Sequence, residues 1–211
     1  MDSRQYCAII GDINRSRELP RRARVQARFE KAIAAVNGEF RDAIASRFVL
    51  TIGDEFQGLL LQPSESVPLV RRFRELMEPV QFAFGVGVGR LSTPLKPAAA
   101  LGMDGDAFHR ARAALTVAKK SGRVVAYDFA GPAMPLANAL AGLMEKHWSR
   151  LTPRQREIAR LLQALDKQKL VARKLGISQP AVSKAASSAV YAQLREADTA
   201  LRNFLATLIP S

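Results

Sequence analysis

The amino-acid sequence predicts an α/β domain followed by a small all-α domain. Up to about residue 130, short β-rich apolar runs alternate with segments in which apolar residues recur every three or four positions, the spacing of a helix. Beyond that point the pattern is entirely helical, and the junction contains Gly131, Pro132 and Pro135. We therefore expect an α/β domain over 1–130, a linker helix over 131–150 and a helical domain over 151–211.

The expected elements of the first domain follow the order β-α-β-β-α-β, with one helix and one strand appended. In chain order they cover residues 6–10, 20–44, 48–52, 56–61, 63–77, 80–88, 104–120 and 123–127. This order is the split β-α-β arrangement of ferredoxin-like folds. The sequence therefore predicts a ferredoxin-like domain with one layered core.

Composition points to a polyanionic partner. The chain of 211 residues has 48% hydrophobic residues and a formal net charge of +13. Residues 1–130 carry 20 Lys and Arg against 14 Asp and Glu, a net of +6, whereas residues 131–211 carry 12 against 5, a net of +7. The smaller part is the more basic per residue, which favours nucleic-acid contact there, although a basic protein without such a partner is the simpler alternative.

Cysteine content and the N-terminal residues indicate the compartment. Cys7 is the single cysteine, so no intramolecular disulfide can form, and its apolar surroundings predict a small buried hydrophobe. The polar start is followed by only a short apolar stretch, unlike a signal peptide or a membrane span. We expect a cytoplasmic protein with no membrane contact.

Two aspartates are the main candidates for chemistry. Asp12 ends the first predicted strand, and Asp54 lies in the hairpin between the second and third. The first and third strands of this motif are antiparallel neighbours, so both residues should meet at one edge of the sheet. Such a pair is a plausible Mg²⁺ or Mn²⁺ site that substrate phosphates complete. A turn cap at Asp12 and an ordinary hairpin residue at Asp54 are the alternative.

Four stretches carry a resemblance to a known family. They are YCAIIGDI from Tyr6, TIGDEFQG from Thr51, FGVGVG from Phe84 and GMDGDAFHRAR from Gly102. In this order they resemble the SatD family over about residues 5–128. More distantly, the layout is similar to the palm domains of class III nucleotidyl cyclases and GGDEF proteins. That resemblance implies a metal held by Asp12, the carbonyl group of Ile13, and Asp54.

The resemblance leaves enzymatic turnover open. Cyclases have a base-selecting lysine where this chain has Leu50, and an asparagine and an arginine where it has His109 and Ala113, with Arg112 one step away. We expect little cyclase activity. The candidate residues for binding a nucleoside triphosphate or a signalling nucleotide are Asn14, Arg15, Ser16, Arg17, His109 and Arg112. A solvated basic loop at 15–17 and a packed or solvated His109 are the alternatives.

The glycines of the strand at 80–88 do not form a dinucleotide-binding motif. Gly85, Gly87 and Gly89 are followed by Arg90-Leu-Ser-Thr-Pro, which does not open a helix. We expect instead that another part of the chain, or a ligand, approaches this strand closely.

The helical domain has the pattern of a helix-turn-helix. A capping box begins at Thr152, a helix over 168–175 is expected to bury Leu170, Val171 and Leu175, and Gly176 to Ser178 form a tight turn. The third helix should turn Val182, Ala186 and Val190 inward. This stretch resembles bacterial transcription-factor modules, and its start is similar to LuxR-type and sigma-factor region 4 modules.

The start of such a recognition helix enters the major groove of DNA. The candidate contacts to bases and phosphates are Arg173, Lys174, Ser178, Gln179, Ser183 and Lys184. A three-helix module that binds protein is the alternative. A final helix carries Leu201, Phe204, Leu205 and Leu208 and should cover the module or form a dimer seam.

The leading hypothesis is a homodimeric, DNA-binding transcriptional regulator whose palm-like domain senses a nucleotide with Mg²⁺. A Mg²⁺-dependent nucleotide-processing enzyme with an accessory helix-turn-helix is the first alternative. A structural adaptor with a degenerate site is the second.

Overall fold

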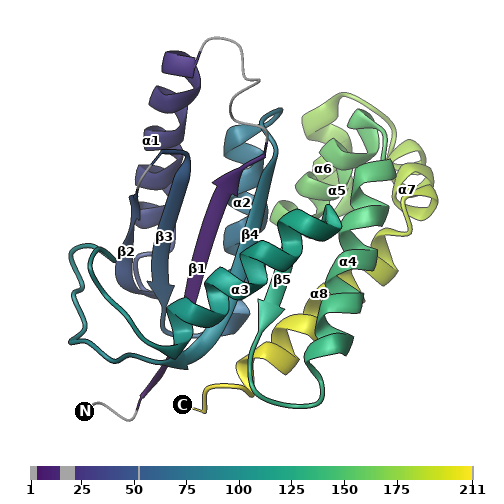
Figure 1. Ribbon diagram of the computed structural model, residues 1–211. Coiled ribbons are helices and arrows are strands. Elements are labelled where there is room, and N and C mark those ends of the chain that lie inside the picture. Colours follow the sequence, from purple (N-terminus) through teal and green to yellow (C-terminus); the bar gives the residue numbers. More distant parts are fainter. Residues whose placement is uncertain (1–3, 15–21, 52, 211) are drawn as a thin grey trace. The chain divides into compact units, whose positions relative to one another are not determined.

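The computed structural model describes residues 4–14, 22–51 and 53–210 (Figure 1). It contains β1 (Gln5–Ile13), α1 (Arg22–Glu39), β2 (Ile44–Leu50), β3 (Glu55–Leu60), the 3₁₀ turn η2 (Pro63–Glu65), α2 (Ser66–Met77), β4 (Phe82–Arg90), α3 (Asp106–Ser121), β5 (Val125–Asp128), α4 (Met134–Arg150), α5 (Pro153–Leu165), α6 (Gln168–Leu175), α7 (Gln179–Ser188) and α8 (Tyr191–Ala206). The chain divides into an α/β unit, residues 1–142 with 201–211, and a helical unit, residues 143–200. None of the helices in the described ranges is long and apolar enough to cross a bilayer.

The α/β unit has the predicted order of elements. Its five strands lie in the order β2-β3-β1-β4-β5, with antiparallel pairing throughout except between β4 and β5, which are parallel. The first and third strands are neighbours, as the split β-α-β motif requires. The ferredoxin-like fold class and the appended α3 and β5 are therefore confirmed.

The first helix is shorter than the sequence predicted. Helical spacing of apolar residues suggested a helix to Ile44, but α1 ends at Glu39 and Ile44 pairs with Leu60 in the sheet. The side chain of Asn37 exchanges two hydrogen bonds with the backbone of Phe48, each 2.8 Å long. This contact fixes the end of α1 against β2. Ile44 matches the helical spacing of apolar residues, but it belongs to β2 and not to the helix.

One face of the sheet packs on α1 and α2 through aromatic rings. Phe29 of α1 and Phe73 of α2 contact phenylalanines of β3 and β4, and the ring of Phe73 stacks on Phe56 at 4.4 Å between centroids. Phe82 and Phe84 belong to the same cluster because alternate residues of a strand share a face. Cys7 is fully buried, as predicted, and burial raises the pKa of its thiol.

The other face packs on α3, which approaches β4 closely. A Cβ atom on Gly85 would lie 2.0 Å from the carbonyl oxygen of Ala111, and one on Gly87 would lie 2.2 Å from the amide nitrogen of the same residue. The glycines therefore let the helix backbone rest directly on the strand. The close approach predicted for this strand is confirmed, and the approaching segment is α3. In Figure 1, α3 crosses the strands at the face nearer the viewer.

A second asparagine has the same role at β5 as Asn37 has at β2. Asn138 of α4 accepts a hydrogen bond from the amide of Tyr127 and donates one to its carbonyl group, both at 2.8 Å. At β2, the loop after β4 adds further backbone bonds, from Arg47 to Pro97 and from Ala100 to Arg47. Both outer strands are thus fixed by segments from outside the sheet.

The last residues of the chain pack on the α/β unit. Phe204 contacts Phe129 at 5.7 Å between ring centroids, Leu201 and Leu205 are buried, and Gln62 donates a hydrogen bond to the carbonyl group of Ile209. The apolar stripe of the final helix was expected to cover the helix-turn-helix or to form a dimer seam. Its buried residues belong instead to the α/β unit.

Candidate functional site

Asp12 lies at the end of β1 on the face that packs against α3. It follows Tyr6, Ala8 and Ile10, which are buried on that face, and strand alternation gives Asp12 the same direction. Its carboxylate accepts a charge-assisted hydrogen bond from the ammonium group of Lys119 on α3. Asp12 is therefore paired across two elements that are far apart in sequence.

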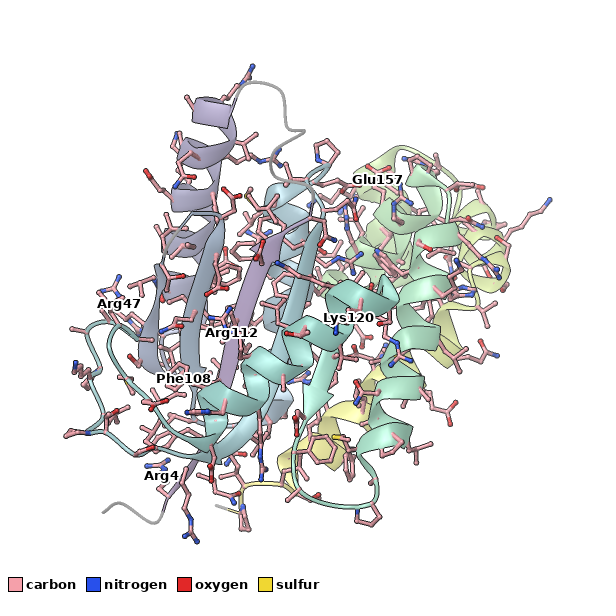
Figure 2. The ribbon with its side chains drawn as sticks, in the orientation of Figure 1. Arg4, Arg47, Phe108, Arg112, Lys120 and Glu157 are labelled. Atoms are coloured by element: carbon pink, nitrogen blue, oxygen red, sulfur yellow. The ribbon has the colours of Figure 1, made fainter. Side chains whose placement is uncertain are left out.

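Glu55, the first residue of β3, stands opposite Asp12 in the strand register. Its carboxylate is bound by both terminal nitrogens of Arg112, one of them at 2.7 Å, and it also lies 3.2 Å from the hydroxyl group of Thr51. Figure 2 shows Arg112 on α3, over the strands. A two-pronged arginine contact of this kind fixes the direction of both side chains.

These two ion pairs form what we call the charged cluster: Asp12, Glu55, Arg112 and Lys119. The carboxylates are the better covered members, with side chains 20% exposed in Asp12 and 14% in Glu55, whereas Lys119 is 42% and Arg112 51% exposed. The hydrogen bond from Arg112 to Glu55, with the charges of Glu55 and Asp12, raises the pKa of Arg112 against the opposing effect of burial. The cations are thus the members of the cluster that are more exposed to solvent.

The backbone of the other two predicted metal ligands, Ile13 and Asp54, lies beside Asp12. The amide of Ile13 donates a 3.3 Å hydrogen bond to the carbonyl group of Asp54, which joins the end of β1 to the hairpin before β3. Among the residues that the structure describes, no three His, Cys, Asp or Glu side chains are grouped to hold a metal ion. Mg²⁺ commonly needs only one or two carboxylates when phosphates and water complete its shell. The Asp12 carboxylate and the backbone oxygen atoms beside it fit part of that requirement, and the carboxylate of Asp54 stays a predicted ligand.

The remaining nucleotide candidates differ in their placement. Arg15, Ser16 and Arg17 lie outside the described residues. The amide of Asn14 donates to the carbonyl group of Gln81 at 2.8 Å. His109 is directed to Asp104, 2.7 Å away, and is highly exposed.

Asp104 has a second hydrogen-bond partner besides His109. The amide of Gly105 donates to it, and these two bonds lower the pKa of the Asp104 carboxyl. Gly105 precedes the first turn of α3. Of the two candidates on α3, only Arg112 belongs to the charged cluster.

Sequence reasoning did not single out Glu55 and Lys119. One signal was present for each: Glu55 is the next carboxylate after Asp54, and Lys119 lies seven residues after Arg112, on the same side of a helix. The pairing itself depends on the register between β1 and β3, which the sequence does not state.

The helical unit has the helix-turn-helix arrangement over α6 and α7. Gly176 has a left-handed backbone, with φ of 63°, and the amide of Ile177 bonds the carbonyl group of Ala172 at 3.1 Å, which ends α6. Ser178 then caps α7 by accepting a hydrogen bond from the amide of Ala181. The capping box at Thr152 that opens α5 is present as well.

The core of this unit differs in part from the prediction. Val171, Val182 and Ala186 are buried as expected and Leu175 packs on them half-buried, but Leu170 is 42% and Val190 39% exposed. Leu170 is on the outer side of the short helix α6. Val190 lies beyond the end of α7, with a left-handed backbone at φ of 51°, so it no longer follows the inward spacing of that helix.

The DNA candidates are on the surface of this unit. Arg173 and Lys174 are exposed in the last turn of α6, Ser178 is exposed just before α7, and Gln179 and Lys184 are exposed on α7, while Ser183 is half-buried. Side chains there point away from the buried residues of the unit. The surface is polar and basic, without an acidic residue from 167 to 195.

Fold and site together define an extended ferredoxin-like domain with a charged cluster at the ends of its central strands, joined to a helix-turn-helix unit. The model of the SatD family matches residues 6–125, more than half of the chain. The chain belongs to the SatD family. No curated protein gives a significant match.

Three solved structures are similar to this chain at low identity. A bacterial light-regulated adenylyl cyclase is 13% identical with a TM-score of 0.43, over 58% of this chain and 74% of the cyclase. The guanylyl cyclase Cya2 is 14% identical with a TM-score of 0.34, over 54% and 70%. A regulator of polyketide synthase expression from Bifidobacterium adolescentis is 14% identical with a TM-score of 0.26, over 94% and 85%.

Proposed function

We propose that this protein is a cytoplasmic, DNA-binding transcriptional regulator whose α/β domain senses a nucleotide together with Mg²⁺ or Mn²⁺. One observation carries the DNA part of the proposal: α7 is capped by Ser178, its first turn is exposed, and it contains no acidic residue. A helix presented in this way is what a helix-turn-helix inserts into the major groove.

The exposed residues divide into two kinds of DNA contact. Gln179 begins α7, and its amide is suited to a bidentate contact with an adenine edge. Ser178 and Ser183 are nearby hydroxyl donors. Arg173, Lys174 and Lys184 are suited to phosphates, which supply affinity without sequence preference. One such unit makes few contacts, so we propose a homodimer that reads two half-sites about one DNA turn apart.

The nucleotide part of the proposal rests on the charged cluster. Arg112 and Lys119 offer cationic groups to phosphate oxygens, and Asp12 with Asp54 offers carboxylate oxygens to a divalent cation. A bound cation would neutralise phosphate charge at this position. Asn14, His109 and the residues at 15–17 remain candidates for further contacts.

The alternative is a Mg²⁺-dependent enzyme that processes a nucleotide, with the helix-turn-helix as an accessory. The ion pairs of Arg112 and Lys119 with carboxylates at the strand ends favour it, because charge of both signs is placed where phosphoryl chemistry needs it. Purified protein incubated with ATP or GTP and Mn²⁺ decides between the two. We expect nucleotide binding without a cyclic product, and rapid cyclic nucleotide formation would favour the enzyme.

DNA binding is tested with the full-length protein, by fluorescence anisotropy on duplex DNA at two salt concentrations. Affinity should fall as salt rises, because each neutralised phosphate releases counterions. Lys184→Ala should weaken binding to all duplexes alike. Gln179→Ala should cost about 1–3 kcal/mol on a selected site and little elsewhere.

The absence of any DNA binding at low salt would refute the regulator proposal and leave a protein-binding module. If binding persists but Lys184→Ala has no effect, the assignment of α7 as the DNA-contacting helix is wrong.

A further inference from the structure

The two cations of the charged cluster lie on one side of α3 but hold their carboxylates differently. Glu55 is bound by two nitrogens of Arg112 and lies near the hydroxyl group of Thr51. Asp12 accepts one hydrogen bond from the single ammonium group of Lys119, whose flexible side chain is 42% exposed. Lys119 can therefore leave its partner with less disturbance of the site than Arg112 can.

Lys119 holds the same carboxylate that a divalent cation would use. A cation that arrives alone has to replace the ammonium group at Asp12, and the displaced group then stays nearby as a like charge. Repulsion between a doubly and a singly charged group at such short range is substantial at the partly covered edge of a protein. Bare cations are therefore disfavoured at Asp12 while Lys119 remains there.

A phosphate-bearing ligand changes this balance. Its oxygens accept the hydrogen bonds that Lys119 donates to Asp12, and their negative charge removes the repulsion between the ammonium group and the cation. The same movement of one side chain thus frees the carboxylate for the cation and provides a contact for the phosphate.

We propose that Lys119 is a counter-ion lock on Asp12, which couples the binding of a divalent cation to the binding of a polyphosphate. This inference deepens the proposed function and rests on it for the identity of the ligand as a nucleoside polyphosphate. Since such coupling is reciprocal, each ligand strengthens the binding of the other.

The test measures two ligands separately on the full-length protein. Mn²⁺ alone is titrated with electron paramagnetic resonance, and the preformed complex of Mn²⁺ with inorganic triphosphate is titrated by calorimetry. The variants are Lys119→Gln, Lys119→Arg and the matched control Lys120→Gln, which alters the next lysine along α3 (Figure 2). Asp12→Asn identifies the Mn²⁺ that binds at this carboxylate, and circular dichroism checks that each variant is folded.

The lock predicts effects of opposite sign. Lys119→Gln should bind bare Mn²⁺ on the order of tenfold more tightly, because the competing charge is removed, and should bind the Mn²⁺–triphosphate complex on the order of tenfold less tightly. Lys119→Arg keeps the competing charge and should bind bare Mn²⁺ no more tightly than the wild type, and Lys120→Gln should change neither titration. A residue with only a structural role would weaken both.

Unchanged or weaker binding of bare Mn²⁺ in Lys119→Gln overturns the lock, even if the Mn²⁺–triphosphate complex binds to the wild type as the proposed function requires. If no variant binds that complex, the nucleotide part of the proposed function and the coupling both fail. The Mn²⁺ titrations alone then decide whether Lys119 guards the carboxylate.

Discussion

Replacing Gly87 with alanine should force α3 away from β4. The added Cβ would lie 2.2 Å from the amide nitrogen of Ala111 and 2.3 Å from the carbonyl oxygen of Ala107, both backbone atoms of the helix. Ordinary contact begins at 3.4 Å, so α3 has to move by about 1.2 Å, the difference between 3.4 and 2.2 Å. Overpacking of this kind costs about 1–3 kcal/mol, which lowers the melting temperature by roughly 3–10 °C for a chain of this size.

The assay combines thermal unfolding with hydrogen exchange of the α3 amides, because exchange reports where the damage lies. Protection from hydrogen exchange should fall first in α3, the helix that carries Arg112 and Lys119. The control is Gly38→Ala in α1, where an added Cβ meets no atom within 4 Å and should raise stability by up to about 1 kcal/mol. A Gly87→Ala protein as stable as the wild type would show that the contact of helix and strand is not as tight as described.

Three further predictions concern stability. Asn37→Ala leaves the buried amide and carbonyl groups of Phe48 without their hydrogen-bond partner. The free energy of unfolding, measured by urea denaturation, should fall by about 2–4 kcal/mol, and a fall below 1 kcal/mol would contradict the role given to this side chain. The hydrogen bond from Arg72 lowers the pKa of Glu39. The contribution of this ion pair to the free energy of unfolding is therefore present at neutral pH and is lost as the pH falls below the ordinary value of 4.5. Glu39→Gln should therefore flatten the acid side of a stability–pH curve, and an unaltered curve would rule this out. Val190→Asn should raise the unfolding free energy by up to about 1 kcal/mol, because asparagine tolerates the left-handed backbone better than a β-branched residue; a destabilised variant would contradict this.

The order of elements was predictable because each strand and helix shows its own spacing of apolar residues. The ends were harder to predict. Ile44 continues the spacing of α1, and only the hydrogen bonds between Asn37 and Phe48 show that the helix has ended before it. Similarly, Val190 fits the inward spacing of α7 until the backbone changes direction after Ser188. Periodicity identifies an element, whereas its ends depend on contacts that are distant in sequence.

The candidate site was predictable in part for the same reason. Asp12 and Asp54 could be brought together from strand order alone, since the first and third strands of this motif are neighbours. Glu55 and Lys119 required the register of the sheet and the path of α3, which is set by the close contact at Gly85 and Gly87. The spacing of Arg112 and Lys119 indicates a shared side of one helix, but their carboxylate partners cannot be read from local sequence.

The contacts of Asn37 and Asn138 also bear on how this protein associates. Phe48 and Tyr127 lie on the two outermost strands of the sheet, where unpaired backbone groups would otherwise invite a strand from another molecule. The asparagine side chains form hydrogen bonds with these backbone groups, and the loop at Pro97 and Ala100 forms backbone hydrogen bonds with Arg47. At these positions the backbone of each edge strand is already bonded, which disfavours growth of the sheet into a neighbouring molecule there.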